Sequence, residues 1–217
     1  MKIYDFFDLN RSLSGRLLSF AEYPWDALDM LGEYIMRVGK GLASDEFNCI
    51  KRGVWVAKSA DVSNSAVLRA PLIVDRNANI GQGALVCGSI IGKGALVGSF
   101  SEVKSSVFFD GAHATQNNYI SDSIVGYKAK FGTGAIVSSR SVNRTKICCL
   151  FGKELISCER RKFGAVVGDM AEIGCSSVLT AGCVVERGAS VSPISRVRGF
   201  ISADGRYARE KIVSDML

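Results

Sequence analysis

The side chain most suited to proton transfer in this sequence is His113, the only histidine among 217 residues. It lies in a polar run from Asp110 to Ser123, and an imidazole takes up and releases a proton near neutral pH. Two other stretches are basic: residues 140–162 hold seven lysines and arginines against two acidic residues, and residues 196–211 hold five against two. Such stretches favour an anionic ligand or nucleic acid, although a solvated basic face gives the same pattern. The chemistry these residues indicate is proton transfer beside an anion.

Seven cysteines raise the possibilities of disulfides, zinc binding and nucleophilic catalysis. Their number is odd and no C-x-x-C pair occurs, so we expect reduced thiols in a cytoplasmic protein. A nucleophile at Cys148 or Cys149 has no companion base that the sequence reveals. No run of about 18 apolar residues occurs, and acidic residues near the N-terminus do not fit a signal peptide, so we expect no membrane association.

The elements that must position these side chains repeat every six residues. Ile80–Leu85 and Ile91–Leu96 both read Ile-Gly-x-Gly-Ala-Leu. Large apolar residues keep this spacing, with a one-residue slip before Ile91 and with two gaps, at Val56, Val62, Leu68, Val74, Ile80, Val86, Ile91, Val97, Val103, Phe109, Val125, Phe131, Val137, Val167, Ile173, Leu179, Val185 and Val191. A period of six fits a short strand plus a turn, repeated. It predicts an all-β solenoid whose coils each contain three hexads and bury the aliphatic side chains inside; a Val- and Gly-rich β-sandwich is the alternative.

Residues 1–42 lie outside the repeat and are expected to be helical. Tyr23-Pro24-Trp25-Asp26 opens a helix, because proline suits the first helical position and aspartate suits the first turn. An apolar stripe with spacings of three and four follows, and Gly39 ends it. We expect this helix to cap the first coils.

The remaining chain divides by the presence of the repeat. We expect β-helix coils in residues 43–137, a basic protruding loop or hairpin in residues 138–163, further coils in residues 164–194 and a C-terminal tail in residues 195–217. After Phe109 the six-residue spacing of large apolar residues, which we call the frame, becomes weaker, and polar residues occupy inward positions around His113. Such a lapse, like a long insertion in a solenoid, is typical of a functional site.

Two motifs give the repeat a family likeness. Residues 23–26 resemble the helix that joins the two domains of sugar-phosphate nucleotidyltransferases, and Arg161–Asp169 resembles their Arg-Lys-x-Gly-Ala-x-x-Gly-Asp segment. Nearly the whole chain is similar to the left-handed β-helix acyltransferases, and above all to the C-terminal domain of the bifunctional N-acetylglucosamine-1-phosphate uridyltransferase/glucosamine-1-phosphate N-acetyltransferase family.

This resemblance implies a left-handed parallel β-helix that forms a homotrimer, with sites in the clefts between subunits. It also implies acetyl-CoA as the donor and an amino-sugar phosphate as the acceptor, in nucleotide-sugar synthesis. No Gly-rich nucleotidyltransferase signature occurs in the sequence. A separate nucleotidyltransferase partner would then supply the uridyltransferase step.

The resemblance also implies site residues, with two departures from the family pattern. The family motif His-Leu-x-Tyr-x-Gly-Asp falls on residues 116–122, where Tyr119 matches but Gln116 replaces the histidine base. The lysine that binds substrate phosphate is kept as Lys104. The acceptor-binding asparagine becomes Ser139.

A glutamine amide cannot take a proton from an ammonium group, so His113, three residues upstream, becomes the candidate base of an acetyltransferase. Backbone N–H groups of the coils would stabilise the oxyanion. We expect the acceptor to be held by Lys104, Gln116, Tyr119, Ser139, Arg144 and Lys146. We expect acetyl-CoA to be held by Thr133, Arg196, Arg198 and Arg206.

The substitutions at Gln116 and Ser139 favour a different interpretation. In it the chain is a non-catalytic trimeric protein that binds CoA or a sugar nucleotide, or that scaffolds a separate nucleotidyltransferase. Nucleic-acid binding is a weaker alternative, because the basic loop holds only two aromatic residues, Phe151 and Phe163, and no known reader motif. Metal chemistry like that of β-helix carbonic anhydrases needs three histidine ligands, so no metal is expected.

Overall fold

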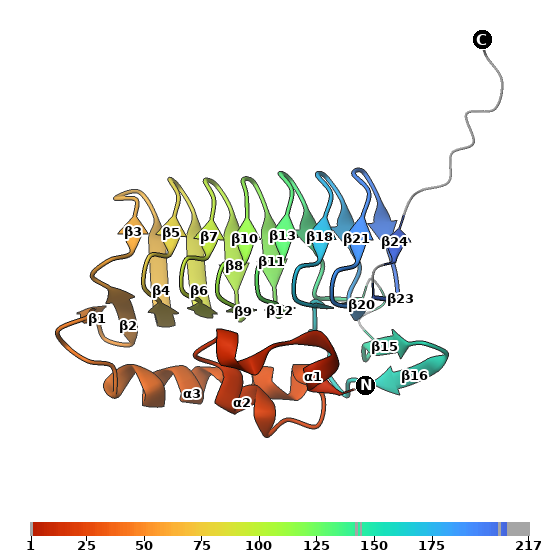
Figure 1. The fold of residues 1–217 in the computed structure, drawn as a ribbon, viewed down its shortest axis with the longest axis horizontal. Helices are drawn as coiled ribbons and strands as arrows, with labels where there is room; N and C mark the ends of the chain where they lie inside the picture. Colours follow the sequence, from red (N-terminus) through yellow and green to blue (C-terminus); the bar gives the residue numbers. More distant parts are fainter. Residues whose placement is uncertain (1, 142, 144, 204, 208–217) are drawn as a thin grey trace, which may run out of the picture.

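The computed structural model describes residues 2–141, 143, 145–203 and 205–207. Its body is a parallel β-helix, and the N-terminal helices lie along one side of it (Figure 1). Successive coils pair strand on strand in parallel register: His113, for example, pairs with Leu96 of the preceding coil and Lys130 of the following one. The solenoid expected from the six-residue period is confirmed.

The coils build three faces. A 14-stranded sheet holds two of them, which join where β4 and β6 bend from one face to the next, and β1 (Phe47–Lys51) pairs antiparallel with β2 at its edge. The first face consists of the first halves of β4 (Val67–Val74) and β6 (Leu85–Ile91), then β8 (Glu102–Lys104), β11 (Tyr119–Ser121), β14 (Ile136–Val137), β19 (Val178–Leu179) and β22 (Arg196–Val197). The second face consists of β2 (Val54–Ala57), the second halves of β4 and β6, β9 (Val107–Phe108), β12 (Ile124–Val125), β17 (Ala165–Val167), β20 (Cys183–Val185) and β23 (Phe200–Ile201). The third face consists of β3 (Asp61–Val62), β5 (Asn79–Ile80), β7 (Leu96–Val97), β10 (His113–Ala114), β13 (Lys130–Phe131), β18 (Glu172–Ile173), β21 (Ser190–Val191) and β24 (Arg206–Tyr207).

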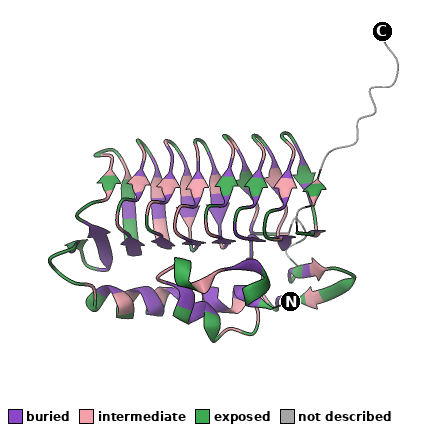
Figure 2. Ribbon diagram, viewed as in Figure 1, coloured by how far each residue is buried: buried purple, intermediate pink, exposed green. Residues whose placement is uncertain are grey.

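A column of apolar side chains fills the interior of the β-helix. On the third face its members follow one another at intervals of 17 or 18 residues, at Val62, Ile80, Val97, Ala114 and Phe131. Stacking the same position of successive coils removes these side chains from water together. Figure 2 shows buried residues in the strands of successive coils.

The frame does not weaken between Phe109 and Val125, contrary to the expectation from the sequence. Phe108, not Phe109, is the inward residue: it pairs with Ile91 and Val125 and lies in the interior column. Phe109 points outward, and its ring centroid lies 5.0 Å from that of Phe7. Two adjacent phenylalanines made the register ambiguous by one residue, and the wrong choice placed their polar neighbours inward.

The N-terminal segment covers the second face. It comprises α1 (Ile3–Phe6), η1 (Leu9–Arg11), α2 (Gly15–Ser19), η2 (Pro24–Asp26) and α3 (Ala27–Lys40). Its apolar side chains, together with Ile147, Cys149, Cys158 and Phe163, form one buried cluster with the outward residues of this face, namely Trp55, Ile73, Ile90, Val107, Ile124, Val166 and Val184. Figure 1 shows the segment extending along the solenoid, with α3 nearest the first coils. It therefore covers a flank that would otherwise expose apolar side chains.

Three hydrogen bonds fasten this segment to corners of the coils. The backbone N–H of Asp110 donates to the carbonyl of Arg11 over 2.9 Å, and that of Asp169 donates to the carbonyl of Phe6 over 2.9 Å. The side chain of Asp169 in turn accepts from the backbone N–H of Asp8 at 2.7 Å. Because the two corners belong to different coils, the segment is anchored at more than one point along the solenoid.

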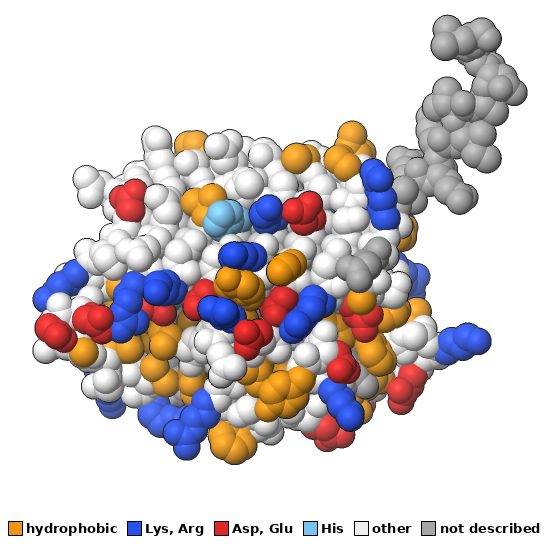
Figure 3. Space-filling model, in the orientation of Figure 1, with side chains coloured by type: hydrophobic (Ala, Val, Ile, Leu, Met, Phe, Trp, Pro, Cys, Tyr) orange, Lys and Arg blue, Asp and Glu red, His pale blue; other side chains and the backbone are white. Residues whose placement is uncertain are grey.

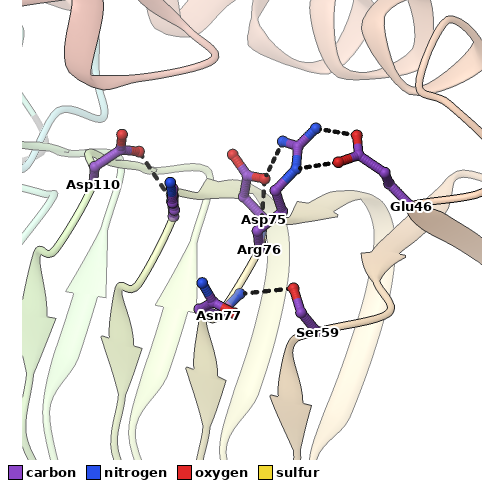
Figure 4. Close-up of polar contacts among 7 residues, drawn as sticks. Glu46, Ser59, Asp75, Arg76, Asn77 and Asp110 are labelled. Carbon is purple, nitrogen blue, oxygen red and sulfur yellow. Dashed lines mark hydrogen bonds and ion pairs between the residues drawn. The ribbon is translucent and has the colours of Figure 1, made fainter.

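Polar contacts fix the first coils (Figure 4). The Arg76 guanidinium pairs with the carboxylate of Glu46 and, over 3.1 Å, with that of Asp75. The backbone N–H of Asn77 donates to the Ser59 hydroxyl at 3.2 Å, which links successive coils. Since Glu46 directly precedes β1, these contacts tie the first strand to a coil corner.

The insertion between β14 and β17 contains an antiparallel hairpin of β15 (Cys148–Phe151) and β16 (Glu154–Ser157). The ring of Phe151 lies 6.0 Å from that of Phe6 and 5.1 Å from that of Phe200. The hairpin is thus packed against α1 and β23. Within the part of the chain that the structure describes, no helix combines the length and the hydrophobicity needed to cross a membrane.

Candidate functional site

His113 lies on the third face, where each strand contributes one side chain to an outward row. Along the sheet this row reads Leu96, His113, Lys130, Glu172, Ser190 and Arg206. The Lys130 ammonium lies 3.3 Å from a Glu172 carboxylate oxygen. Figure 3 shows histidine, basic and acidic side chains gathered on this face of the molecule. The row gives His113 charged neighbours of both signs.

Two adjoining hollows follow this row. One, of about 380 Å³, is lined by Gly111, His113, Lys128, Lys130, Met170 and Glu172. The other, of about 510 Å³, shares Lys130 and Glu172 with the first and extends to Arg206. We call the two hollows together the third-face groove. Lys128 and Lys130, against the single carboxylate of Glu172, leave the lining of the His113 end with net positive charge, which favours an anion.

Three of the residues predicted to hold the acceptor, Lys104, Tyr119 and Ser139, lie on or beside the first face. The Lys104 ammonium lies 5.7 Å from the ring centroid of Tyr119 and pairs with Glu102, whose hydrogen bond raises the pKa of Lys104. Ser121 is the register partner of Lys104, and its hydroxyl lies 3.5 Å from the hydroxyl of the buried Ser139. The structure therefore brings Lys104, Tyr119 and Ser139 together in one cluster.

Gln116 and Thr133 occupy the corner between these two groups of residues. Gln116 is exposed at the turn from β10 to β11. Thr133 takes the same place one coil later, where its hydroxyl lies 3.3 Å from that of Thr115. His113 and Tyr119 thus lie on different faces of one subunit. A ligand that contacts both must bend round this corner or meet one of them on another chain.

The arginines predicted to bind the donor lie further along the solenoid. Arg206 lines the third-face groove four strands from His113, a separation of about 19 Å at ~4.8 Å per strand. Arg196 is exposed on β22 of the first face, three strands or about 14 Å from Tyr119. Arg198 is exposed immediately after β22. Of these three arginines, Arg206 alone lines the third-face groove, in the hollow that adjoins the one lined by His113.

The two loop residues predicted to hold acceptor phosphate are Lys146 and Arg144. Lys146 pairs with Glu159 at the base of the hairpin. Arg144 lies outside the described residues. The contact of this loop with the acceptor stays a prediction.

Sequence reasoning missed Lys128, Lys130 and Glu172. Lys130 follows His113 by 17 residues, which is one coil on this face, so aligning the chain with itself at the length of a coil would have found it. Glu172 follows Lys130 by 42 residues because the hairpin intervenes. No fixed offset identifies that residue.

Much of the chain is similar in sequence to known proteins. Residues 68–157 match the family model described as the GMPPB C-terminal domain. The bifunctional protein GlmU of an Exiguobacterium species is 31% identical over 169 residues, covering 72% of this chain and 33% of that protein. The chain resembles a GlmU C-terminal domain. GlmU of Bacillus mycoides is 36% identical over 109 residues, covering 50% of this chain and 20% of that protein. The predicted likeness is confirmed, and the chain spans about a third of the length of the curated relatives it matches.

Solved structures also match part of the chain. The acetyltransferase domain of PglB from Neisseria gonorrhoeae, in complex with acetyl coenzyme A, is 19% identical with a TM-score of 0.34, covering 61% of this chain and 53% of that one. A putative acetyltransferase from Bacillus cereus is 17% identical with a TM-score of 0.37, covering 64% of this chain and 68% of that one.

Proposed function

We propose that this protein transfers an acetyl group from acetyl-CoA to the amino group of a sugar phosphate such as glucosamine-1-phosphate, with His113 as the general base. The observation that carries the proposal is the position of His113 in the third-face groove, beside Lys128 and Lys130. The similarity to GlmU over 169 residues supports it.

The reaction needs an unprotonated amine, and His113 would provide it. The amine nitrogen attacks the thioester carbonyl carbon, a C–N bond forms, and the C–S bond breaks with the electron pair leaving on sulfur. The proton lost by the nitrogen passes to the imidazole and from there to the CoA thiolate. His113 is partly exposed in the groove and can therefore reach a bound amine. Lys128 and Lys130 line the same hollow and would neutralise the phosphate of the acceptor.

Acetyl-CoA would lie along the rest of the third-face groove. The groove extends about 19 Å from His113 to Arg206, so a phosphate of the donor can pair with that guanidinium while the thioester lies near the imidazole. The groove would thus orient the donor along the row of outward side chains.

The first-face cluster of Lys104 and Tyr119 would complete the acceptor site from a neighbouring subunit of a homotrimer. This arrangement accounts for their position round the corner from His113. Exposed apolar side chains on or beside the first face, at Phe100, Ile136 and Ile194, favour a contact between subunits there.

A non-catalytic protein that binds CoA or a sugar nucleotide is the second candidate function. Two observations favour it: Gln116 stands at the position of the family's histidine, and Ser139 is buried where the family has an asparagine that contacts the acceptor. Neither side chain can act as a base.

The test is release of CoA thiol from acetyl-CoA in the presence of glucosamine-1-phosphate, measured for the wild type, His113→Ala and Asn79→Ala. Asn79 occupies the same outward row two coils earlier, outside the groove, and is the matched control. We expect His113→Ala to lower turnover by about 10²- to 10⁴-fold and Asn79→Ala to leave it unchanged.

The other outcomes separate the candidates. Turnover that survives in His113→Ala would keep the enzyme and remove His113 from its mechanism. CoA binding by calorimetry without turnover of several amino-sugar phosphates would favour the binding protein. Absence of both turnover and CoA binding would overturn the acetyltransferase proposal.

A further inference from the structure

A hollow of about 850 Å³, open to solvent, lies between α3 and the first coils. One wall consists of residues of α3, from Gly32 to Lys40, and the other consists of Arg52, from the turn between β1 and β2, with Ala70 and Pro71 of β4. We call it the α3 cavity. It shares no lining residue with the third-face groove, so it is a separate feature of the molecule.

Positive charge converges on the α3 cavity. Arg37, Lys40 and Arg52 line it, against a single carboxylate, Glu33. Among the described residues, none of these three cations forms an ion pair, and the Arg37 guanidinium lies 5.4 Å from the ring centroid of Tyr34. Three like charges around one hollow repel each other, and an anion bound between them relieves that repulsion.

Part of the cavity wall is apolar. Met36, Ala70 and Pro71 line it, and Met36 and Pro71 are partly buried. Such a surface suits a flat, weakly polar group, because binding removes apolar area of both the group and the protein from water. The cavity thus combines an apolar wall with a cationic rim.

Gly32 keeps part of this cavity open. A Cβ built on it meets one heavy atom, Cγ of Pro71, at an ordinary contact distance of 3.8 Å, and its φ is not left-handed. A glycine inside a helix is about 1 kcal/mol less favourable than alanine. Neither packing nor backbone conformation requires glycine at this position, so its effect is to leave space above the helix.

We propose that the α3 cavity binds a nucleoside phosphate, with the base on the apolar wall and the phosphates between Arg37, Lys40 and Arg52. The volume lies within the range of about 300–1,000 Å³ that is usual for small-molecule sites. Guanidinium groups pair with phosphate through two parallel hydrogen bonds, which makes arginine the residue of choice for such a rim. CoA carries the same chemistry in its adenosine phosphates, so a free nucleotide and CoA are the two sources to distinguish.

The experiment is a fluorescence titration of the full chain with N-methylanthraniloyl-ADP at low salt. We expect Arg52→Ala to weaken binding at least about tenfold, because a charge-assisted contact is lost. Gly32→Leu should abolish binding by filling the cavity, while its control Gly32→Ala binds within about twofold of the wild type. Lys153→Ala, which removes an exposed cation at the hairpin, and His113→Ala should also bind as the wild type does.

Three results would overturn the proposal. The first is absence of binding by the wild type, and the second is undiminished binding by both Arg52→Ala and Gly32→Leu. The third is a loss of affinity in Lys153→Ala equal to that in Arg52→Ala, because it would show unspecific attraction to positive charge. Circular dichroism and thermal unfolding establish that each variant is folded.

Competition by unlabelled ADP, CoA and inorganic phosphate identifies the source of the ligand. Stronger displacement by CoA than by ADP assigns the site to CoA, and the reverse assigns it to a free nucleotide. Since His113→Ala tests this binding separately, failure here leaves the proposed acetyl transfer standing.

Discussion

The carboxylate of Asp169 accepts a hydrogen bond from the backbone N–H of Asp8 at 2.7 Å, across 161 residues of sequence. The same carboxylate accepts from the backbone N–H of Tyr127 at 2.8 Å and from the Arg187 guanidinium at 3.1 Å. Asp169 ends the Arg-Lys-x-Gly-Ala-x-x-Gly-Asp segment that the family likeness rests on. In this chain that aspartate fastens the N-terminal segment to the coils.

Replacing this carboxylate should destabilise the protein. Asp169 is 3% exposed, so Asp169→Ala leaves two backbone N–H groups without an acceptor in a place that water hardly reaches. We expect the free energy of unfolding, measured in urea, to fall by about 2–4 kcal/mol. The exposed Asp45 provides the control: Asp45→Ala should stay within about 0.5 kcal/mol of the wild type. Equal effects of the two substitutions would contradict the fastening role.

Asp110 should give stability a measurable dependence on pH. Burial raises the pKa of this carboxyl, although a hydrogen bond from the backbone of Lys93 opposes the shift. The folded chain therefore binds a proton at higher pH than the unfolded chain, and protonation favours the folded state. We expect the free energy of unfolding of the wild type, relative to Asp110→Asn, to increase as the pH falls from about 7 towards 4. A difference that stays flat or decreases over this range would show that burial does not dominate.

Two glycines of α3 should respond oppositely to alanine. A Cβ on Gly39 would lie 2.3 Å from the ring of Trp55, whereas a Cβ on Gly32 fits without a clash. Gly32→Ala should raise the free energy of unfolding by about 0.5–1 kcal/mol through helix propensity. Gly39→Ala should lower it by about 1–3 kcal/mol, because the indole must shift. Thermal or urea unfolding of the pair checks this, and stabilisation by Gly39→Ala would mean that α3 does not press on Trp55.

The cysteines should divide into fast and slow groups towards iodoacetamide. Cys49, Cys148 and Cys175 are exposed, while Cys149, Cys158 and Cys183 are buried. Burial raises the pKa of Cys183 to about 12. A hydrogen bond with Cys158, whose sulfur lies 3.1 Å away, and burial raise the pKa of Cys149. Since the thiolate is the reactive form, mass spectrometry after brief treatment at about pH 8 should find the exposed three modified first. Early modification of Cys149 would show that the hairpin opens readily.

The β-helix could be predicted from the sequence because its interior requires an apolar side chain at about every sixth residue. The spacing did not identify the inward residue where two adjacent residues were equally suitable. Phe108 and Phe109 are both large, apolar and fully buried, one in the interior column and the other under the N-terminal segment. Since the second surface is created only when that segment packs, the pattern by itself does not separate the two roles.

The candidate site was predictable only in part. His113 stood out because no other histidine occurs, and Lys104 and Tyr119 fell on positions of a family motif. The residues that surround His113 come from other coils, and their neighbourhood depends on the register between strands. The 42 residues between Lys130 and Glu172 exceed the length of a coil because the hairpin intervenes, so sequence distance conceals their contact. The α3 cavity was unforeseen for the same reason, since it requires a helix and a coil corner to meet.

The path of the N-terminal segment has a consequence for how the molecule unfolds. Coils of a solenoid contact only their neighbours, so a bare β-helix can fray from either end, one coil at a time. Here α3 packs on β4 and β6, while Phe6, at the end of α1, is bonded to Asp169 between β17 and β18. Early and late coils are therefore connected by a second route besides the stack itself. The loss of any coil along this route also costs the contacts of the segment, so we expect most of the chain to unfold in a single cooperative step.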